Sequence, residues 1–235
     1  MTFALLTFLL AGCLHPVPAP PPAPPPLPGP MPFIAHVPGG PISVDTDDAV
    51  VGERSAAMAI LEWSDIQCPY CGVAFPPLAA YVRTHPDVRL IYKHYPISGL
   101  CNPEIEGVRH EYACAAARAA ICADQRGRFE DLASLMFSNQ GTLGEEDIVG
   151  FARAAHVYNK AFTTCEASPA TAAKLSRDIQ EGVAAHVQGT PTFFVLGPWG
   201  PRWVQIGGGP GAVITVLDAG RRGIPLPEPL PPEAE

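Results

Sequence analysis

The distribution of proline limits where this chain can fold. Thirteen of its 29 prolines lie in residues 16–41 and five in residues 225–232, which leaves eleven for the long segment between them. Proline lacks a backbone N–H donor, so dense runs of it build neither helices nor central strands. We therefore predict a globular domain over residues 42–223, a Pro-rich tether before it, and a Pro-rich acidic tail over residues 224–235.

The amino terminus has the pattern of an export signal. Residues 2–12 form an apolar run of the length of a signal-peptide core, too short to span a bilayer, although no Lys or Arg precedes it. The run ends in Leu10-Ala11-Gly12-Cys13, which resembles the lipobox of bacterial lipoproteins, where the cysteine is lipidated. We predict a signal peptide over residues 1–12 and a lipidated Cys13 followed by a tether to residue 41. A plain secretory signal is the alternative.

Composition narrows the class of the folded middle. The whole chain is 47 % apolar and 16 % charged, a composition that allows a sizeable hydrophobic core. The 15 Lys and Arg against 23 Asp and Glu give a formal charge of −8, which argues against a nucleic-acid partner, because such proteins need a basic face. The seven cysteines leave at least one outside any intrachain pair, and a lipidated Cys13 would account for it.

The order of apolar patterns predicts an α/β fold. Residues 55–63 and 88–95 are typical of buried strands, and an apolar stretch ending at Val82 lies between them. The later predicted elements are helices over 111–126, 129–139, 145–155 and 171–186, strands over 193–196 and 203–206, and a helix over 212–221. Without the block of helices, a β-α-β unit followed by a β-β-α unit remains.

Two cysteines three residues apart follow the first strand, in Cys68-Pro69-Tyr70-Cys71. At the start of a helix, free N–H groups and the positive end of the helix dipole stabilise a thiolate at Cys68. Cys71, one turn further, can resolve a mixed disulfide formed by Cys68. Half of a zinc site is the alternative, but the sequence holds no second C-x-x-C to complete it. We predict no metal and no cofactor.

Several short runs carry a resemblance to a known family. They are residues 63–72 (WSDIQCPYCG), Pro76, and residues 189–194 (GTPTFF). Together they resemble the DsbA-like thiol–disulfide oxidoreductases over about residues 45–222. The resemblance implies an α/β, thioredoxin-like fold, in which helices flank a central mixed sheet and an all-helical subdomain is inserted at about residues 101–186.

The resemblance also implies roles for individual residues. Pro191 falls in the cis-proline loop that faces the catalytic disulfide, and Thr190 would present backbone groups to substrate. Glu62 falls where the family keeps a buried carboxylate, which would relay a proton to Cys71. The dipeptide Pro69-Tyr70 tunes the redox potential. The alternatives are a solvated strand position for Glu62 and an ordinary trans turn proline at Pro191.

The remaining cysteines, Cys101, Cys114, Cys122 and Cys165, allow three pairings. Cys114 and Cys122 lie eight residues apart on one predicted helix, about 12 Å at 1.5 Å per residue, which excludes a disulfide between them. Of the other two pairings we favour Cys101–Cys114 with Cys122–Cys165, which requires the chain to break near Gly107. We predict structural staples; a pair that relays electrons is the alternative.

The resemblance implies a protein-disulfide oxidoreductase, and the predicted signal peptide and lipidated Cys13 place it on the periplasmic side of the cell envelope, lipid-anchored to the membrane. It would oxidise the cysteines of exported client proteins and be reoxidised by a membrane partner, either DsbB-like or vitamin K epoxide reductase-like. One alternative is a disulfide reductase or isomerase of the envelope. Another is a tethered binding lipoprotein in which a Cys68–Cys71 disulfide is merely structural.

Overall fold

A computed structural model describes residues 34–36 and 42–226 of this chain. The predicted signal peptide, Cys13 and nearly all of the predicted tether lie outside the described residues, as does the tail from residue 227 onward. Among the residues that are described, no helix is long and apolar enough to cross a membrane.

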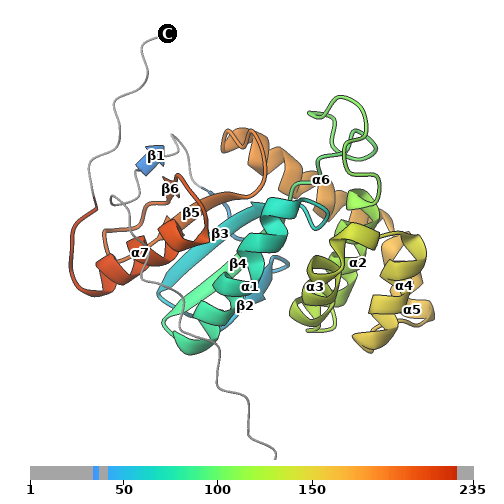
Figure 1. The fold of residues 1–235 in the computed structure, drawn as a ribbon, viewed down its shortest axis with the longest axis horizontal. Coiled ribbons are helices and arrows are strands. Elements are labelled where there is room, and N and C mark those ends of the chain that lie inside the picture. Colours follow the sequence, from blue (N-terminus) through green and yellow to red (C-terminus); the bar gives the residue numbers. More distant parts are fainter. Residues whose placement is uncertain (1–33, 37–41, 227–235) are drawn as a thin grey trace, which may run out of the picture.

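A mixed sheet forms the centre of the described structure, with its strands in the order β1-β6-β5-β3-β4-β2 (Figure 1). The strands are β1 (Ile34–His36), β2 (Ala49–Val51), β3 (Met58–Ser64), β4 (Val88–His94), β5 (Thr192–Leu196) and β6 (Val204–Ile206). Strand β3 pairs parallel with β4 and antiparallel with β5. Every residue of β3 is buried, including the polar Glu62 and Ser64, because helices cover both faces of the sheet at this central strand.

Helices cover both faces of the sheet. Helices α1 (Pro69–Thr84) and α7 (Pro210–Arg221) lie on one face, and α6 (Pro169–Ala184) lies on the other. Alternate side chains of β3 serve the two faces, because Ile60 joins the core beneath α1 whereas Leu61 and Trp63 join the core beneath α6.

The chain between β4 and α6 builds a group of helices at one side of the sheet (Figure 1). They are α2 (Ala113–Asp124), α3 (Phe129–Ser138), the short 3₁₀ helix η1 (Gln140–Thr142), α4 (Glu145–Ala154) and α5 (Lys160–Glu166). An aromatic cluster joins this group to the sheet: Phe75 of α1 stacks on Phe137, and Tyr92 of β4 packs against Phe129. One continuous core therefore runs from the sheet into the helices.

The predicted thioredoxin-like α/β fold with an inserted helical group is confirmed, with local differences. Strand β3 begins at Met58 rather than residue 55, because a turn closed by Ala56 N donating to Glu53 O precedes it. The strands β1 and β2 and the helix α5 were not predicted, because three to seven residues are too few to show a period.

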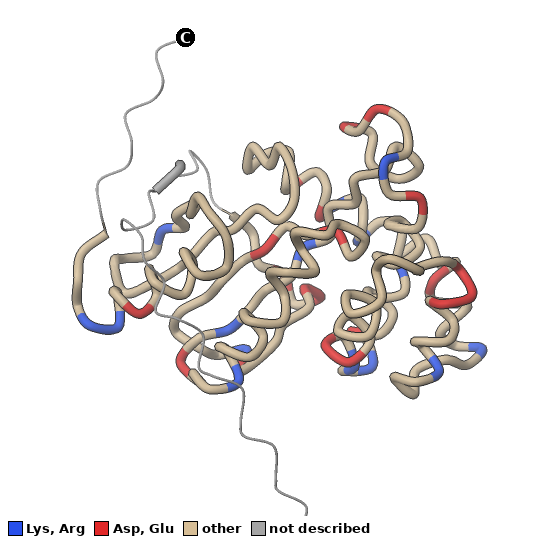
Figure 2. The backbone as a smooth tube through the Cα atoms, in the orientation of Figure 1, with Lys and Arg blue, Asp and Glu red and all other residues tan. Residues whose placement is uncertain are grey.

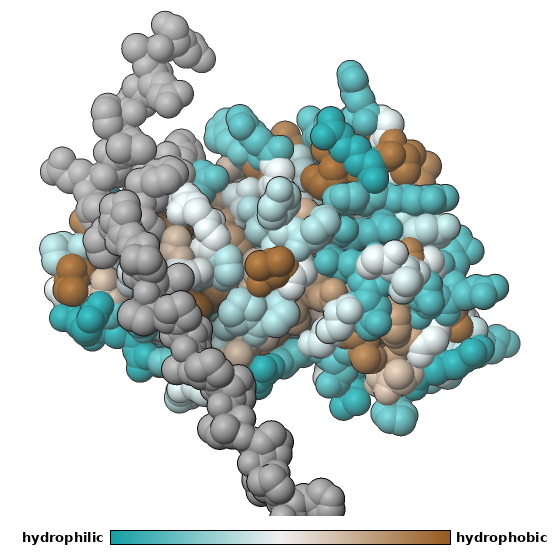
Figure 3. Space-filling view, in the orientation of Figure 1, coloured by the Kyte–Doolittle hydropathy of each residue, from teal (hydrophilic) through white to brown (hydrophobic). Residues whose placement is uncertain are grey.

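The described surface is mixed in charge and mainly hydrophilic. Figure 2 shows Lys and Arg dispersed along the chain among Asp and Glu. Apolar side chains form separate small patches on the face drawn in Figure 3. The large exposed apolar residues include Tyr70 and Val73 at the start of α1, and Leu100 and Val108 in the loop between β4 and α2.

Candidate active site

Cys68 occupies the amino-terminal cap of α1. Strand β3 ends at Ser64, and a turn in which Cys68 N donates to Asp65 O leads into the helix. Cys68 has extended backbone angles (φ −72°, ψ 122°), and Pro69 follows as the first helical residue. Both Cys68 and Cys71 are free thiols, so the structure shows the dithiol state of the pair.

The two thiols have opposite electrostatic environments. The neighbouring Cys71 thiol stabilises the Cys68 thiolate, and with the N–H groups of Tyr70 and Cys71 it lowers the pKa of Cys68 to about 5 although burial opposes this. Burial raises the pKa of Cys71 well above its ordinary value, and the Cys68 thiol and the Glu62 carboxyl reinforce that shift. Cys68 is therefore the nucleophile and Cys71 the thiol that stays protonated.

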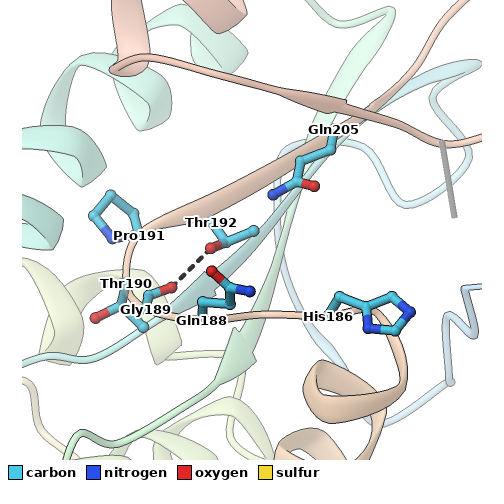
Figure 4. Close-up of a pocket in the computed structure, with 7 residues that line it drawn as sticks. All are labelled: His186, Gln188, Gly189, Thr190, Pro191, Thr192 and Gln205. Carbon is cyan, nitrogen blue, oxygen red and sulfur yellow. Dashed lines mark hydrogen bonds between the residues drawn. The ribbon is translucent and has the colours of Figure 1, made fainter. Parts of the chain in front are cut away.

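The loop before β5 faces Cys68. Its Thr190–Pro191 peptide bond is cis, and the Cys68 thiol donates to Thr190 O at 3.3 Å. In the close-up of Figure 4, Thr192 Oγ1 donates to Gly189 O across this loop at 2.7 Å. The sequence resemblance placed Pro191 opposite the cysteines, and the structure brings these segments together across more than 120 residues of chain.

Two cavities meet at this loop. One, of about 560 Å³, lies on the side drawn in Figure 4 and is lined by residues that include His186, Gln188 and Gln205. The other, of about 530 Å³, contains Cys68, Tyr70 and residues of the loop between β4 and α2. Residues 188–190 line both, so an extended segment lying along them would pass directly over the Cys68 thiol.

Glu62 is buried beneath the cysteines, with none of its surface exposed. It points to the α1 face of β3 and lies opposite Tyr92 in the register with β4. Neither carboxylate oxygen has a hydrogen-bond partner among the described residues, and neither does the Tyr92 hydroxyl. Burial raises the pKa of Glu62 to about 8. A solvated position for Glu62 is thus wrong, and its carboxyl is protonated at neutral pH.

The other four cysteines form two disulfides. Cys101 is bonded to Cys114 and Cys122 to Cys165, with Cα atoms 6.0 and 5.9 Å apart. This is the pairing that we favoured. The required break in the chain is also present, because Gly107 has a left-handed φ of 72° and α2 begins only at Ala113.

Sequence reasoning missed several polar residues that hold the active-site turn. Gln140 of η1 donates from Nε2 to the carbonyls of Ile66 (2.5 Å) and Cys68 (2.8 Å). A Cβ at Gly72 would overlap the Gln140 amide, so a larger residue here would displace that amide from its position. Gln140 lies 72 residues from Cys68, and no local pattern marks such a contact.

Asp65 and His110 form a second missed pair. Asp65 is 2 % exposed, and its carboxylate accepts from the backbone N of Gln67 and Ile97 and contacts His110 Nδ1, each at 2.7 Å. The ring of His110 lines the cavity that contains Cys68. Asp65 lies within residues 63–72, which carry the family resemblance, but no pattern in the sequence predicted its contact with a histidine 45 residues later.

Comparisons with known proteins place this geometry in a family. Residues 59–210 match the model of the DSBA-like thioredoxin domain. A Na(+)/H(+) antiporter NhaA 1 of Salinispora arenicola is 32 % identical over 157 residues, which are 66 % of this chain and 23 % of that protein. The NhaA of Herminiimonas arsenicoxydans is 29 % identical over 179 residues, 75 % of this chain and 26 % of that protein. The chain spans about a quarter of the length of these curated relatives.

Solved structures share the fold. A thioredoxin-like oxidoreductase from Silicibacter pomeroyi has a TM-score of 0.60 at 23 % identity, covering 76 % of this chain and 94 % of that one. Pseudomonas aeruginosa DsbA2 has a TM-score of 0.56 at 23 % identity, covering 73 % and 91 %. A periplasmic thioredoxin-like protein from Salmonella enterica serovar Typhimurium has 0.60 at 18 %, covering 76 % and 92 %. By the family match, this chain belongs to the DSBA-like thioredoxin domains.

Proposed function

We propose that this protein oxidises pairs of cysteines in exported client proteins through Cys68 and Cys71. The observation that carries the proposal is the asymmetry of the two thiols. The pKa of Cys68 is lowered to about 5, whereas that of the buried Cys71 is raised. A structural disulfide needs no such difference, but a redox pair that attacks and resolves does.

The reaction starts from the Cys68–Cys71 disulfide. A client thiolate attacks the Cys68 sulfur, a client–Cys68 bond forms, and the Cys68–Cys71 bond breaks with its electron pair left on Cys71. The Cys71 thiolate then takes a proton, for which the buried Glu62 carboxyl is the nearby donor. Glu62 is suited to this step because its carboxyl is protonated at neutral pH and can donate the proton. Once ionised, its negative charge would disfavour a thiolate at Cys71.

The second step releases the client. A second client thiolate attacks the client sulfur of the mixed disulfide, and Cys68 leaves as a thiolate. Two electrons have then moved from the client to the Cys68/Cys71 dithiol, and a membrane partner that is DsbB-like or vitamin K epoxide reductase-like would accept them. Stabilising the Cys68 thiolate favours the reduced form and raises the potential, which favours oxidation of clients over their reduction.

The loop at Pro191 would position the client. Proline has no N–H, so the loop offers no backbone donor at this position. The neighbouring backbone groups stay free to pair with an extended client segment. Thr190 would supply backbone groups to that segment beside the Cys68 sulfur. The exposed Tyr70 of the active-site dipeptide would meet the client from the other side.

We further propose that Cys13 is lipidated, that residues 13–41 tether the domain to the membrane, and that the domain works on the periplasmic side. The support is the sequence of residues 1–41. The anchor is tested by fractionating cells: the protein should be recovered in the membrane fraction, and Cys13→Ser should not. The antiporter activity in the names of the curated relatives is not proposed here, because this chain matches about a quarter of each.

Trapping tests the redox proposal. In Cys71→Ala, mixed disulfides through Cys68 cannot be resolved, so cells should accumulate adducts that reducing agent releases, and Cys68→Ala should accumulate none. The absence of adducts would favour a binding protein with a structural disulfide. A measured potential separates the enzymatic alternatives, since about −120 mV marks an oxidant and about −270 mV a reductant.

A further inference from the structure

The loop between β4 and α2 carries a histidine to the redox pair. Residues 97–110 fold back on themselves through a bridge between Ser98 and Val108, and Gly99 N donates to Gly107 O at 2.7 Å. The Cys101–Cys114 disulfide closes the same loop onto the first turn of α2. His110 is thereby held at the wall of the cavity that contains Cys68.

Asp65 fixes the orientation of the His110 ring. The Asp65 carboxylate is buried and contacts His110 Nδ1 at 2.7 Å, so that nitrogen carries the proton and the other is left for the cavity or for solvent. The hydrogen bond to Asp65 holds the pKa of His110 above its ordinary value. The backbone N of Asp65 also donates to Cys71 Sγ at 3.4 Å, so the same residue joins the histidine to the redox pair.

The active-site dipeptide supplies no cation to the cavity around Cys68. Pro69 and Tyr70 are neutral, and the Tyr70 side chain is exposed to solvent, the residue being 75 % exposed. The charged or titratable side chains that line the cavity with Cys68 include Tyr70, Glu104, Glu106, Arg109 and His110. Of these, His110 is the one held by a buried carboxylate, and the backbone N of the same residue, Asp65, donates to Cys71 Sγ.

We propose that His110, positioned by Asp65, stabilises the Cys68 thiolate as an imidazolium when that thiolate leaves the mixed disulfide with a client. No bond to His110 forms or breaks; the electron pair stays on the Cys68 sulfur, and the positive ring lowers its energy. The inference rests on the proposed function, yet its central claim concerns the reduced protein alone and is measured without a client.

The first test is the pH dependence of Cys68 alkylation in the full reduced chain. In His110→Gln the pKa of Cys68 should rise, and the thiolate fraction near the parent's midpoint should fall by about three- to tenfold. His110→Lys, which keeps a cation, should restore most of that fraction. His85→Gln is the matched control, because His85 caps the far end of α1, about 24 Å along the helix at 1.5 Å per residue.

The second test uses linkage and leaves His110 in place. If the two charges interact, the His110 ring, followed by NMR, should titrate at a lower pH in Cys68→Ala than in the reduced parent. An unchanged Cys68 profile in folded His110→Gln, or an unchanged His110 titration in Cys68→Ala, would overturn the inference. Failure to trap clients with both shifts present would instead reject the proposed function and leave the inference intact.

Discussion

The two faces of the sheet each bury an ionisable side chain on neighbouring strands, and the surroundings of these two side chains differ. On the α6 face, Lys93 of β4 is 0 % exposed and lies 2.9 Å from Asp48 and 2.5 Å from Glu181. Lys174 completes the cluster, at 2.8 Å from Asp48 and 2.5 Å from Asp178. Burial alone would lower the pKa of Lys93, but these carboxylates outweigh it and raise that pKa.

On the α1 face, Glu62 of β3 is equally buried but has no ion-pair or hydrogen-bond partner within the described residues. Its pKa is accordingly raised to about 8 by burial. A buried charge with partners keeps its charge and serves the fold, whereas a buried carboxyl without partners stays protonated and ready to exchange a proton. The face that holds Cys71 is the one with the unpaired group.

The largest effect should come from removing the buried cation Lys93 from the ion-pair cluster on the α6 face. Lys93→Met removes the buried cation that Asp48 and Glu181 share, so the free energy of unfolding should fall by about 3 to 5 kcal/mol. Urea denaturation at neutral pH measures this, with the exposed Lys160→Met as control. The Cys68 alkylation profile of the folded variant should be unchanged. A loss below about 1 kcal/mol would show that the cluster does not stabilise the fold.

The buried Glu62 on the α1 face should make the free energy of unfolding depend on pH. Because the pKa of Glu62 is raised from 4.5 to about 8, its contribution is fully present below pH 4.5 and is lost as pH rises toward 8. At about 1.4 kcal/mol per pH unit, the loss by pH 7 is about 3 kcal/mol. Glu62→Gln should lack this part of the dependence. Parallel stability curves for the reduced parent and Glu62→Gln between pH 4.5 and 8 would contradict the assignment.

The two thiols above Glu62 should differ in reactivity. In the reduced protein at neutral pH, Cys68 should be alkylated about 100-fold faster than Cys71, because only Cys68 is a thiolate there. Its rate should fall as pH drops through about 5. Peptide mass spectrometry after brief labelling assigns the modified cysteine, and the Cys101–Cys114 and Cys122–Cys165 disulfides serve as unlabelled internal controls. Equal labelling of Cys68 and Cys71 would reject the asymmetry.

The smallest effect concerns single hydroxyl groups. The Tyr92 hydroxyl is buried without a partner in the described part of the chain, so Tyr92→Phe should change the free energy of unfolding by less than about 1 kcal/mol or raise it slightly. Tyr81→Phe is the matched control, since Tyr81 OH donates to Asp218 at 2.7 Å and its loss should cost about 1 kcal/mol. A larger loss in Tyr92→Phe than in Tyr81→Phe would reveal a partner for Tyr92, such as buried water.

Local sequence was enough for the features that depend on neighbours along the chain. Cys68, Pro69 and Cys71 follow a buried strand and open a helix, so their chemistry was readable from spacing. The exclusion of a Cys114–Cys122 bond followed from helix geometry alone. The short strand β2 was missed because three residues show no alternation that separates a strand from a loop.

What the sequence by itself determined, then, is the strand–CPYC–helix unit, the family resemblance and the confinement of proline excess to the ends of the chain. Only the tertiary structure decided which charges are paired. Lys93 meets Glu181 across 88 residues, His110 meets Asp65 across 45, and Glu62 meets no partner among the residues described. The physical reason is that burial and Coulomb interactions depend on distance in space, which sequence spacing specifies only within one helix or strand.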